Sequence, residues 1–427
     1  MSARRTAIVV YILAIWFVIS FVTNIIGPLM PTIISDFGLN LALAGFLPFS
    51  FFLAYGIVSI PAGIAVERYG AKRALLGAFA LNLAGALAIA LLPNYAMAIA
   101  ALFVIGLGMA MLQVVINPLM RTAGGEAHFA FYSVMGQLVF GLASFLSPFA
   151  FSALMQQASD VSSQDGVSAA LIRLSPANLP WVSFYWAFSA IFVALIALTS
   201  AINIPKVELA DEERAGTRAT YVKLFANRHV RLYFLGIVAY VGTEQTLANW
   251  MSQFLGTYHQ VSPIVEGAHA VALFWGLMSV GCVLGLLLLK ILDSKIVLVA
   301  FSALAMLCAA AALFGPKEAA LFAFPASGFF LSVMFSVIFS LALNSASQHH
   351  GALSGILCTG ILGGAVLPLL VGFLGDRLGL RTAMTLVFLT IAYIFSIGIW
   401  ARPLVRNQTV DLMRLLGLSK QTLPENR

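Results

Sequence analysis

The chain has 427 residues, of which 61% are hydrophobic and 9% are charged, and its formal net charge is +7. Soluble domains carry about 25% charged residues, so the composition excludes a soluble protein and indicates a chain that lies almost wholly in a membrane. The net charge does not indicate nucleic-acid binding, because the basic residues are distributed as membrane topology requires.

The sequence predicts an all-α membrane protein with twelve transmembrane helices. Its apolar stretches reach the length of about 18 residues that a spanning helix needs, whereas barrel strands would alternate over about ten residues. The first stretch is too long for a signal peptide and lacks a small-residue cleavage site, so we expect it to be retained. The predicted helices cover residues 6–34, 43–66, 74–93, 96–120, 130–155, 181–203, 231–258, 267–290, 296–314, 318–344, 351–374 and 382–402.

Two connections are long, and the second divides the chain into two groups of six helices. The first runs over 156–180 and is polar; the second runs over 204–230 and carries a charge run that we interpret as a solvated linker. Alternating-access carriers built from repeats have this organisation, with the substrate site between the halves near the membrane midplane. The predicted domains are a six-helix bundle at 1–203, a cytoplasmic linker at 204–230, a six-helix bundle at 231–402 and a cytoplasmic tail at 403–427 with a short interfacial helix.

The basic residues predict the orientation. If twelve spans place both termini on one side, that side carries all 23 Lys and Arg residues except Arg173, Lys317, Arg377 and Arg381. Cytoplasmic segments carry an excess of Lys and Arg, so both termini are expected to be cytoplasmic in a multi-pass protein of the cytoplasmic (inner or plasma) membrane.

The first helix and the loop after the second helix hold the first candidate residues. Asn24 lies beside Gly27, Pro28 and Pro31, which predict a break that exposes backbone groups to a cavity. The run Gly63-Ile-Ala-Val-Glu67-Arg68-Tyr-Gly70-Ala-Lys72-Arg73 resembles the loop signature of the major facilitator superfamily, although that family normally has Asp where this chain has Glu67. The resemblance implies a gating role for Gly63, Glu67, Arg68, Gly70, Lys72 and Arg73.

Amide side chains four residues apart form polar stripes on three predicted helices. Gln113 and Asn117 share one face of the fourth helix. The same spacing recurs in the seventh helix at Gln245, Asn249 and Gln253, and in the tenth at Ser336, Ser340, Asn344 and Gln348. Amides that donate and accept, together with an aromatic face, suit a neutral, hydroxyl-rich ligand such as a sugar. The alternative is that these groups only join helices within the membrane.

Two further residues complete the predicted substrate site. Trp275 lies deep within the eighth predicted helix, away from the interfacial belt where Trp normally collects, and is a candidate sugar platform or a packing residue. Gln137 in the fifth helix is the remaining candidate.

Glu244 is the only one of the 16 Asp and Glu residues that falls in the middle of an apolar segment. A charge at the bilayer centre costs about 2.5–3.5 kcal/mol, so it usually persists where it faces a cavity, a partner or a proton path. Glu244 is therefore the candidate ion-coupling residue; the alternative is a hydrogen-bonded Glu that joins two helices. In a straight helix Glu244 lies roughly 140° around from Asn249, so both cannot face one cavity squarely.

Several runs, in matching order over nearly the whole chain, resemble the fucose:proton symporter family of sugar porters. These are Gln113-Val-Val-Ile-Asn117-Pro118-Leu-Met-Arg121 with Gly124-Gly125-Glu126, Gly242-Thr-Glu244 with Asn249-Trp250, Phe274-Trp275-Gly276, and Gly363-Gly364 with Pro368 and Gly372-Phe-Leu-Gly-Asp376-Arg377. The resemblance implies the major facilitator fold and a monosaccharide transporter, usually driven by protons and in some relatives by sodium.

This chain departs from the family at two positions. Some proton-coupled members carry an Asp four residues before the proline that matches Pro31, where this chain has Gly27, and a Glu where it has Gln113. Neither residue can titrate, so proton coupling would depend on Glu244, and sodium coupling or facilitated diffusion is the alternative.

The sequence thus predicts a secondary transporter that imports a monosaccharide of the glucose, galactose, mannose, fucose or N-acetylglucosamine type by alternating access. No catalytic residue, cofactor or metal is expected; the partners are the sugar, a co-transported proton or Na⁺, and the bilayer, with no nucleic acid, and the carrier functions as a monomer. A proton-driven exporter of another small molecule is the alternative, which the lack of a Gly-Pro pair in the fifth helix disfavours. An intramembrane enzyme is disfavoured because Glu244 has no second midspan acid, His or Lys beside it.

Overall fold

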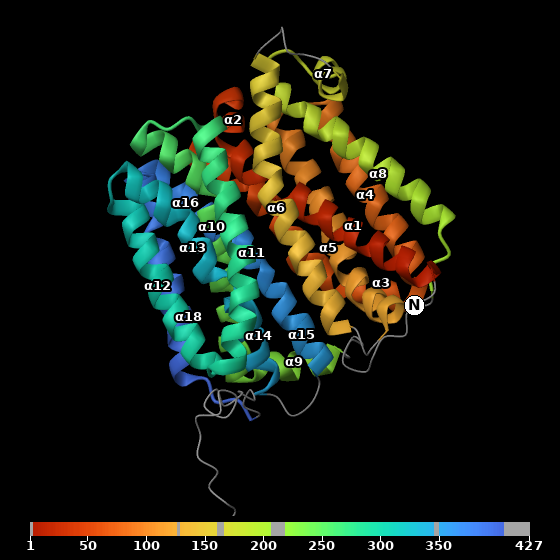
Figure 1. Cartoon of the computed structure of the whole chain (residues 1–427), viewed down its shortest axis with the longest axis vertical. Coiled ribbons are helices and arrows are strands. Elements are labelled where there is room, and N and C mark those ends of the chain that lie inside the picture. Colours follow the sequence, from red (N-terminus) through yellow and green to blue (C-terminus); the bar gives the residue numbers. More distant parts are fainter. Residues whose placement is uncertain (1–2, 126–128, 160–165, 206–217, 346–349, 405–427) are drawn as a thin grey trace, which may run out of the picture.

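The computed structural model describes residues 3–125, 129–159, 166–205, 218–345 and 350–404, and the regular elements of these residues are all helical (Figure 1). The N-terminus and α9 lie at one end of the bundle, here called the N-terminal end, and α2 and α7 lie at the other, here called the α7 end. The predicted interfacial helix of the tail falls outside the described residues.

The first half of the bundle holds six spans. Its elements are α1 (Ala3–Asn24), α2 (Ile26–Phe37), α3 (Leu41–Tyr69), α4 (Ala71–Leu91), α5 (Tyr95–Gly124), α6 (Phe129–Ser159), α7 (Gly166–Arg173), η3 (Pro180–Val182) and α8 (Ser183–Ala201). The first span is interrupted at Ile25, within the segment where the sequence predicts a break, and continues to Phe37 rather than ending at residue 34.

The second half contains more interruptions. Its elements are α10 (Arg228–His259), η4 (Pro263–Gly267), α11 (Ala268–Ile291), α12 (Ser294–Phe314), α13 (Lys317–Leu331), α14 (Met334–Leu343), α15 (His350–Thr359), η5 (Gly360–Leu362), α16 (Gly363–Leu378), α17 (Leu380–Met384) and α18 (Leu386–Trp400). The last three spans, predicted as single helices, are each broken into shorter helical segments.

Both long connections contain helices that the sequence analysis did not predict. The segment 156–180 holds α7, and the linker at 204–230 holds α9 (Arg218–Ala226) and the start of α10. The helix α9 lies against α10 and α15, and the aromatic ring of Phe225 lies 5.5 Å from that of Phe234. The sequence did not predict helices in these connections, because short helices held by such tertiary contacts have little apolar periodicity of their own.

The helix α10 is less apolar than the other predicted spans. In the described residues eleven helices are long and apolar enough to cross a membrane, and α10 is not one of them. It has 32 residues, so at about 1.5 Å per residue it exceeds the hydrocarbon core of about 30 Å, and it makes the twelfth span. Most of its central residues are buried against other helices, which explains why it can be polar.

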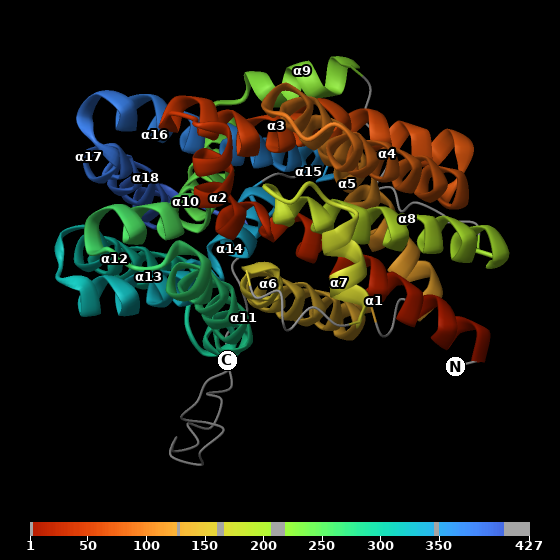
Figure 2. The same cartoon turned by 90° about the horizontal axis from the view of Figure 1, so that it is seen from above.

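The two halves lie side by side, and several helix pairs join them (Figure 2). The helix α3 packs on α16, α6 packs on α11, and α2 packs on α10. The hydrophobic core extends through both halves and across these contacts. Glycine permits the closest approach within the second half: a Cβ atom at Gly363 would lie 2.7 Å from the carbonyl carbon of Val238 on α10.

We predict that Gly363→Ala destabilises the protein by about 1–3 kcal/mol, because the added methyl group would overlap the α10 backbone. The matched control is Gly77→Ala on α4, where a Cβ atom would meet no atom within 4 Å and where alanine favours the helix by up to about 1 kcal/mol. Thermal unfolding in detergent should show a lower midpoint for Gly363→Ala only. Equal midpoints for the two variants would contradict this account of the α10–α16 contact.

Candidate functional site

A chain of hydrogen bonds joins the single midspan carboxylate to two amides on α10. The Tyr240 hydroxyl donates to Glu244 Oε1 at 2.8 Å, and Gln245 Nε2 donates to Glu244 Oε2 at 3.4 Å. Asn249 Nδ2 in turn donates to Gln245 Oε1 at 3.4 Å. Glu244 and Asn249 point to different sides of the helix, and Gln245 connects them, so a shared cavity face is not needed for them to interact.

The two ends of this chain face different neighbours. The Tyr240 ring lies 5.9 Å from the Phe335 ring on α14, within the second half. A Cβ atom at Gly364 on α16 would lie 3.1 Å from both Gln245 Cγ and the Phe52 ring, so Gln245 lies where α10, α16 and α3 of the first half meet. Glu244 is partly buried, whereas Gln245 and Asn249 are only 6% and 3% exposed.

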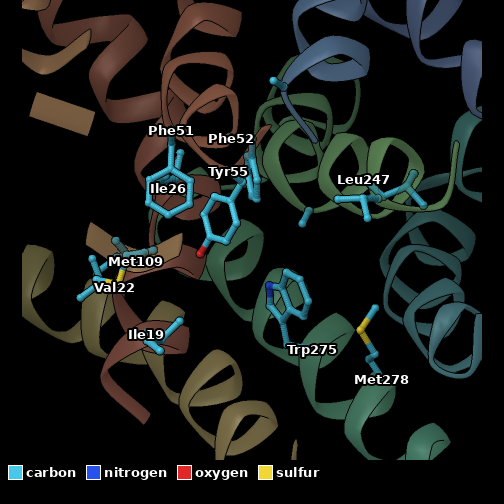
Figure 3. Close-up of a cluster of buried hydrophobic side chains, with 14 of the residues drawn as sticks. Ile19, Val22, Ile26, Phe51, Phe52, Tyr55, Met109, Leu247, Trp275 and Met278 are labelled. Atoms are coloured by element: carbon cyan, nitrogen blue, oxygen red, sulfur yellow. The ribbon is translucent and has the colours of Figure 1, made fainter. Parts of the chain in front are cut away.

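Trp275 lies beside this region, in a buried cluster formed by residues of both halves. Figure 3 shows Trp275 and Met278 from α11 and Leu247 from α10 in the same cluster as Tyr55, Phe52 and Met109 from the first half. Trp275 is 4% exposed, and its indole Nε1 is buried without a hydrogen-bond partner in the described part of the chain. Because buried polar groups are normally paired, this N–H is a free donor for a ligand.

The predicted residues of α5 lie close to the cluster. Gln113 is one helical turn from Met109 and therefore on the same face of α5. It is half-buried and makes no hydrogen bond to another described residue. Asn117 lies one turn further along α5, and its side chain is outside the described residues.

Four predicted residues do not join this group. Asn24 donates from Nδ2 to Ser144 Oγ at 2.8 Å and so connects the end of α1 to α6. Gln253 donates to Thr257 on its own helix at 3.4 Å, and Asn344 donates to Ser340 at 3.3 Å at the end of α14. Gln137 is exposed on α6.

The predicted gating residues lie at the turn from α3 to α4. Lys72 Nζ donates to the carbonyl oxygens of Ser200 and Ile202 at 2.8 and 2.9 Å, and so holds the end of α8. Arg68 and Arg73 are exposed, and Gly70 has a φ of 82°, which only glycine adopts readily. A Cβ atom at Gly63 would meet no atom within 4 Å, and the side chain of Glu67 is outside the described residues.

Sequence reasoning missed two polar residues near the group. Tyr55 on α3 is buried in the cluster of Figure 3, and Thr246 Oγ1 on α10 is buried without a partner among the described residues. The midspan position of Tyr55, away from the interfacial belt, was an available signal. The sequence contains no comparable signal for Thr246, because a threonine in a membrane helix usually bonds its own backbone.

The structure explains why position 27 is glycine. A Cβ atom there would lie 2.6 Å from the carbonyl oxygen of Ala248 on α10, one turn beyond Glu244. An Asp side chain would not fit at Gly27 in this arrangement, and Glu244 is the nearby carboxylate on the facing helix. The described residues contain no group of three His, Cys, Asp or Glu side chains that could hold a metal ion.

Comparison of the sequence with known proteins identifies related transporters. A sequence model of the Major Facilitator Superfamily matches residues 12–361. The glucose/galactose transporter of Brucella abortus (biovar 1, strain 9-941) is 32% identical over 396 residues, which are 90% of this chain and 92% of that protein. The L-fucose-proton symporter of Escherichia coli (strain K12) is 24% identical over 414 residues, which are 93% of this chain and 92% of that protein.

Solved structures agree on the fold. The crystal structure of the E. coli fucose:proton symporter in the outward conformation superimposes with a TM-score of 0.65 at 21% identity and covers 92% of this chain and 98% of that chain. The predicted major facilitator fold and the predicted resemblance are therefore confirmed.

We predict that Asn24→Ala lowers the free energy of unfolding by about 1 kcal/mol, because it removes the buried bond from Asn24 to Ser144 that joins α1 to α6. Gln137→Ala is the control, since an exposed side chain contributes within about 0.5 kcal/mol. Denaturation in detergent would measure both. A neutral Asn24→Ala would return Asn24 to the list of ligand-binding candidates.

Proposed function

The chain belongs to the Major Facilitator Superfamily, and from that premise we propose that it imports a monosaccharide by alternating access, driven by protons. The observation that carries the proposal is the hydrogen-bonded chain from Glu244 through Gln245 to Asn249. It ends where the two halves meet, since the Asn249 Cα lies 3.6 Å from a Cβ atom placed on Gly27 of the first half. The names of the Brucella and E. coli relatives support a hexose of the glucose or galactose type or a deoxyhexose such as fucose.

The chemistry of the site suits a neutral ligand rich in hydroxyl groups. Gln245 and Asn249 each offer an amide that donates and accepts, and the Trp275 indole offers an unpaired N–H beside a flat apolar ring. A sugar presents hydroxyl groups at its edge and C–H groups on its faces, so the two kinds of surface match. Gln113 on α5 would contact the sugar from the first half.

Proton binding would be linked to sugar binding through Gln245. While Glu244 is ionised, its carboxylate attracts the Gln245 Nε2 donor, which lies 3.4 Å from Glu244 Oε2. Protonation of Glu244 weakens that attraction, which frees the amide to turn toward a sugar hydroxyl, and it removes the charge that opposes occlusion. Release of the proton on the other side would restore the chain and lower the affinity for sugar.

We propose that the N-terminal end is cytoplasmic, because the loops at that end hold most of the Lys and Arg residues. The two bundles at 1–203 and 231–402 would then rock about the buried cluster, as in other carriers with a midplane site. At the α7 end the halves are in close contact, since a Cβ atom at Gly45 on α3 would lie 3.1 Å from the Leu369 Cα on α16.

A sodium-coupled or uncoupled sugar carrier is the second candidate. The observation that favours it is the absence of a titratable group at Gly27 and Gln113, which leaves Glu244 as the one midspan acid. A proton-driven exporter of another molecule is a third candidate on the same fold. The carrier needs no partner subunit to complete its site, so we propose a functional monomer.

The substrate and the ion can be tested together in proteoliposomes. Uptake of radiolabelled glucose, galactose, mannose, fucose and N-acetylglucosamine would be followed with an imposed proton gradient, with a sodium gradient and with neither. We expect accumulation of glucose or galactose under the proton gradient. Accumulation under the sodium gradient alone would identify sodium as the coupling ion. No uptake of any sugar would favour the exporter.

We predict that Glu244→Gln abolishes proton-driven accumulation and keeps exchange of labelled for unlabelled sugar. Exchange cycles only the loaded carrier, in which the neutral Gln mimics the protonated acid, whereas net uptake requires the proton to leave. The control is Glu318→Gln at the exposed start of α13. Proton-driven accumulation that survives Glu244→Gln at the level of the control would refute the coupling role.

A further inference from the structure

A carboxylate of the second half caps a helix of the first half at the α7 end. Asp376, near the end of α16, accepts hydrogen bonds from the backbone N–H groups of Leu41 and Ala42 at 2.8 and 2.9 Å. These groups belong to the first turn of α3, where backbone donors have no acceptor within the helix. The third donor of this turn, the N–H of Leu43, is satisfied at 2.8 Å by Asn40 of the same half.

Two glycines bring the helices close enough for this contact. A Cβ atom at Gly372 would overlap the Leu41 carbonyl, and one at Gly375 would lie 2.9 Å from Leu41 Cδ1. The turn after Asp376 is held by Tyr258 on α10. The backbone N–H of Arg381 donates to the Tyr258 hydroxyl at 3.0 Å, and the Arg381 guanidinium lies 4.4 Å from the Tyr258 ring centre. These contacts with α10 hold the turn that places Asp376 against α3.

The segment around Asp376 repeats the spacing of the gating segment at the other end. Gly372, Asp376, Arg377, Gly379 and Arg381 follow one another with the same intervals as Gly63, Glu67, Arg68, Gly70 and Lys72. Both final glycines join two helices with nearly equal backbone angles, φ 82° and ψ 159° at Gly70 and φ 83° and ψ 148° at Gly379. Their surroundings differ: Gly63 meets open space, whereas Gly372 is packed against α3.

We propose that Asp376 is a gating residue of the transport cycle, which closes the α7 end by capping α3 across the two halves. This inference rests on the proposed alternating access. When the α7 end opens, the N–H groups of Leu41 and Ala42 lose their acceptor, and the negative charge moves away from the positive end of the α3 dipole. The cap therefore stabilises the closed α7 end relative to the open one, and it forms and breaks once in each cycle.

Hydrogen–deuterium exchange of the full chain in detergent tests the cap without sugar or a gradient. Asp376→Asn keeps the shape of the side chain but replaces one acceptor with an NH₂ group, so exchange in the peptide that contains Leu41 and Ala42 should become about fivefold faster. The matched control is Asp36→Asn at the same end, because Asp36 accepts from Trp181 Nε1 at 2.8 Å within the first half. Exchange at Leu41 and Ala42 should be unchanged in this control.

A second measurement reads the opening itself. Leu369 on α16 lies at the contact between the halves, because its Cα would be 3.1 Å from a Cβ atom placed on Gly45 of α3. In a Leu369→Cys protein, Asp376→Asn should raise the rate of reaction with a membrane-impermeant maleimide by a similar factor, and Asp36→Asn should not. The native cysteines lie within spans and are corrected for by labelling the parent protein.

The exchange and labelling rates together test whether the Asp376 cap acts as a gate. Faster exchange at Leu41 and Ala42 together with faster labelling supports the cap as a gate. Unchanged exchange and labelling, or a uniform rise in exchange over all helices, would overturn it, the latter because it would assign Asp376 to general stability. Both readouts are independent of substrate, so failure of the sugar assay would leave the gating result intact, and failure here would leave the sugar proposal intact.

Discussion

The interior of a bilayer offers no water to backbone N–H and C=O groups, so every such group must find its partner within the protein. This constraint makes each span helical and allows a break only where protein surrounds it. The interruptions at Ile25, at Ser332–Val333 and at Gly360–Leu362 all satisfy it in the same way, because α2, α14 and η5, the segments at these breaks, each pack against α10. The helix α10 thus supports these three interruptions of the spans.

Because other helices surround α10, this helix can carry polar residues at midspan, namely Glu244, Gln245 and Asn249. A bond between side chains in a membrane contributes about 0.6 kcal/mol, whereas a charge at midspan costs about 2.5–3.5 kcal/mol. The bonds from Tyr240 and Gln245 to Glu244 therefore offset only part of the cost of that carboxylate. Glu244 is in addition linked through Gln245 to Asn249, at the contact between the halves.

An alternating carrier also requires that the contacts between its halves be breakable. The contacts at the α7 end meet this requirement: glycines against backbone, the ring pair Phe46 and Phe373 at 5.9 Å, and one carboxylate on two amides. None of these contacts buries an ion pair, which would be costly to separate and to restore. The N-terminal end holds a segment of the same pattern, in which a Cβ atom at Gly63 would meet no atom within 4 Å, whereas Gly372 is packed against α3.

The sequence by itself determined the class of fold, the number of spans, the break near Gly27 and the isolation of Glu244, because hydrophobic length and the cost of a buried charge are local properties of the chain. It could not determine which amides meet, since helical spacing gives the face of one helix but not its neighbour. Only the tertiary structure separated Gln245 and Asn249, which lie at the contact between the halves, from Asn24, which bonds α1 to α6. The cap by Asp376 joins residues 335 positions apart, a distance along the chain over which no sequence pattern reports a contact.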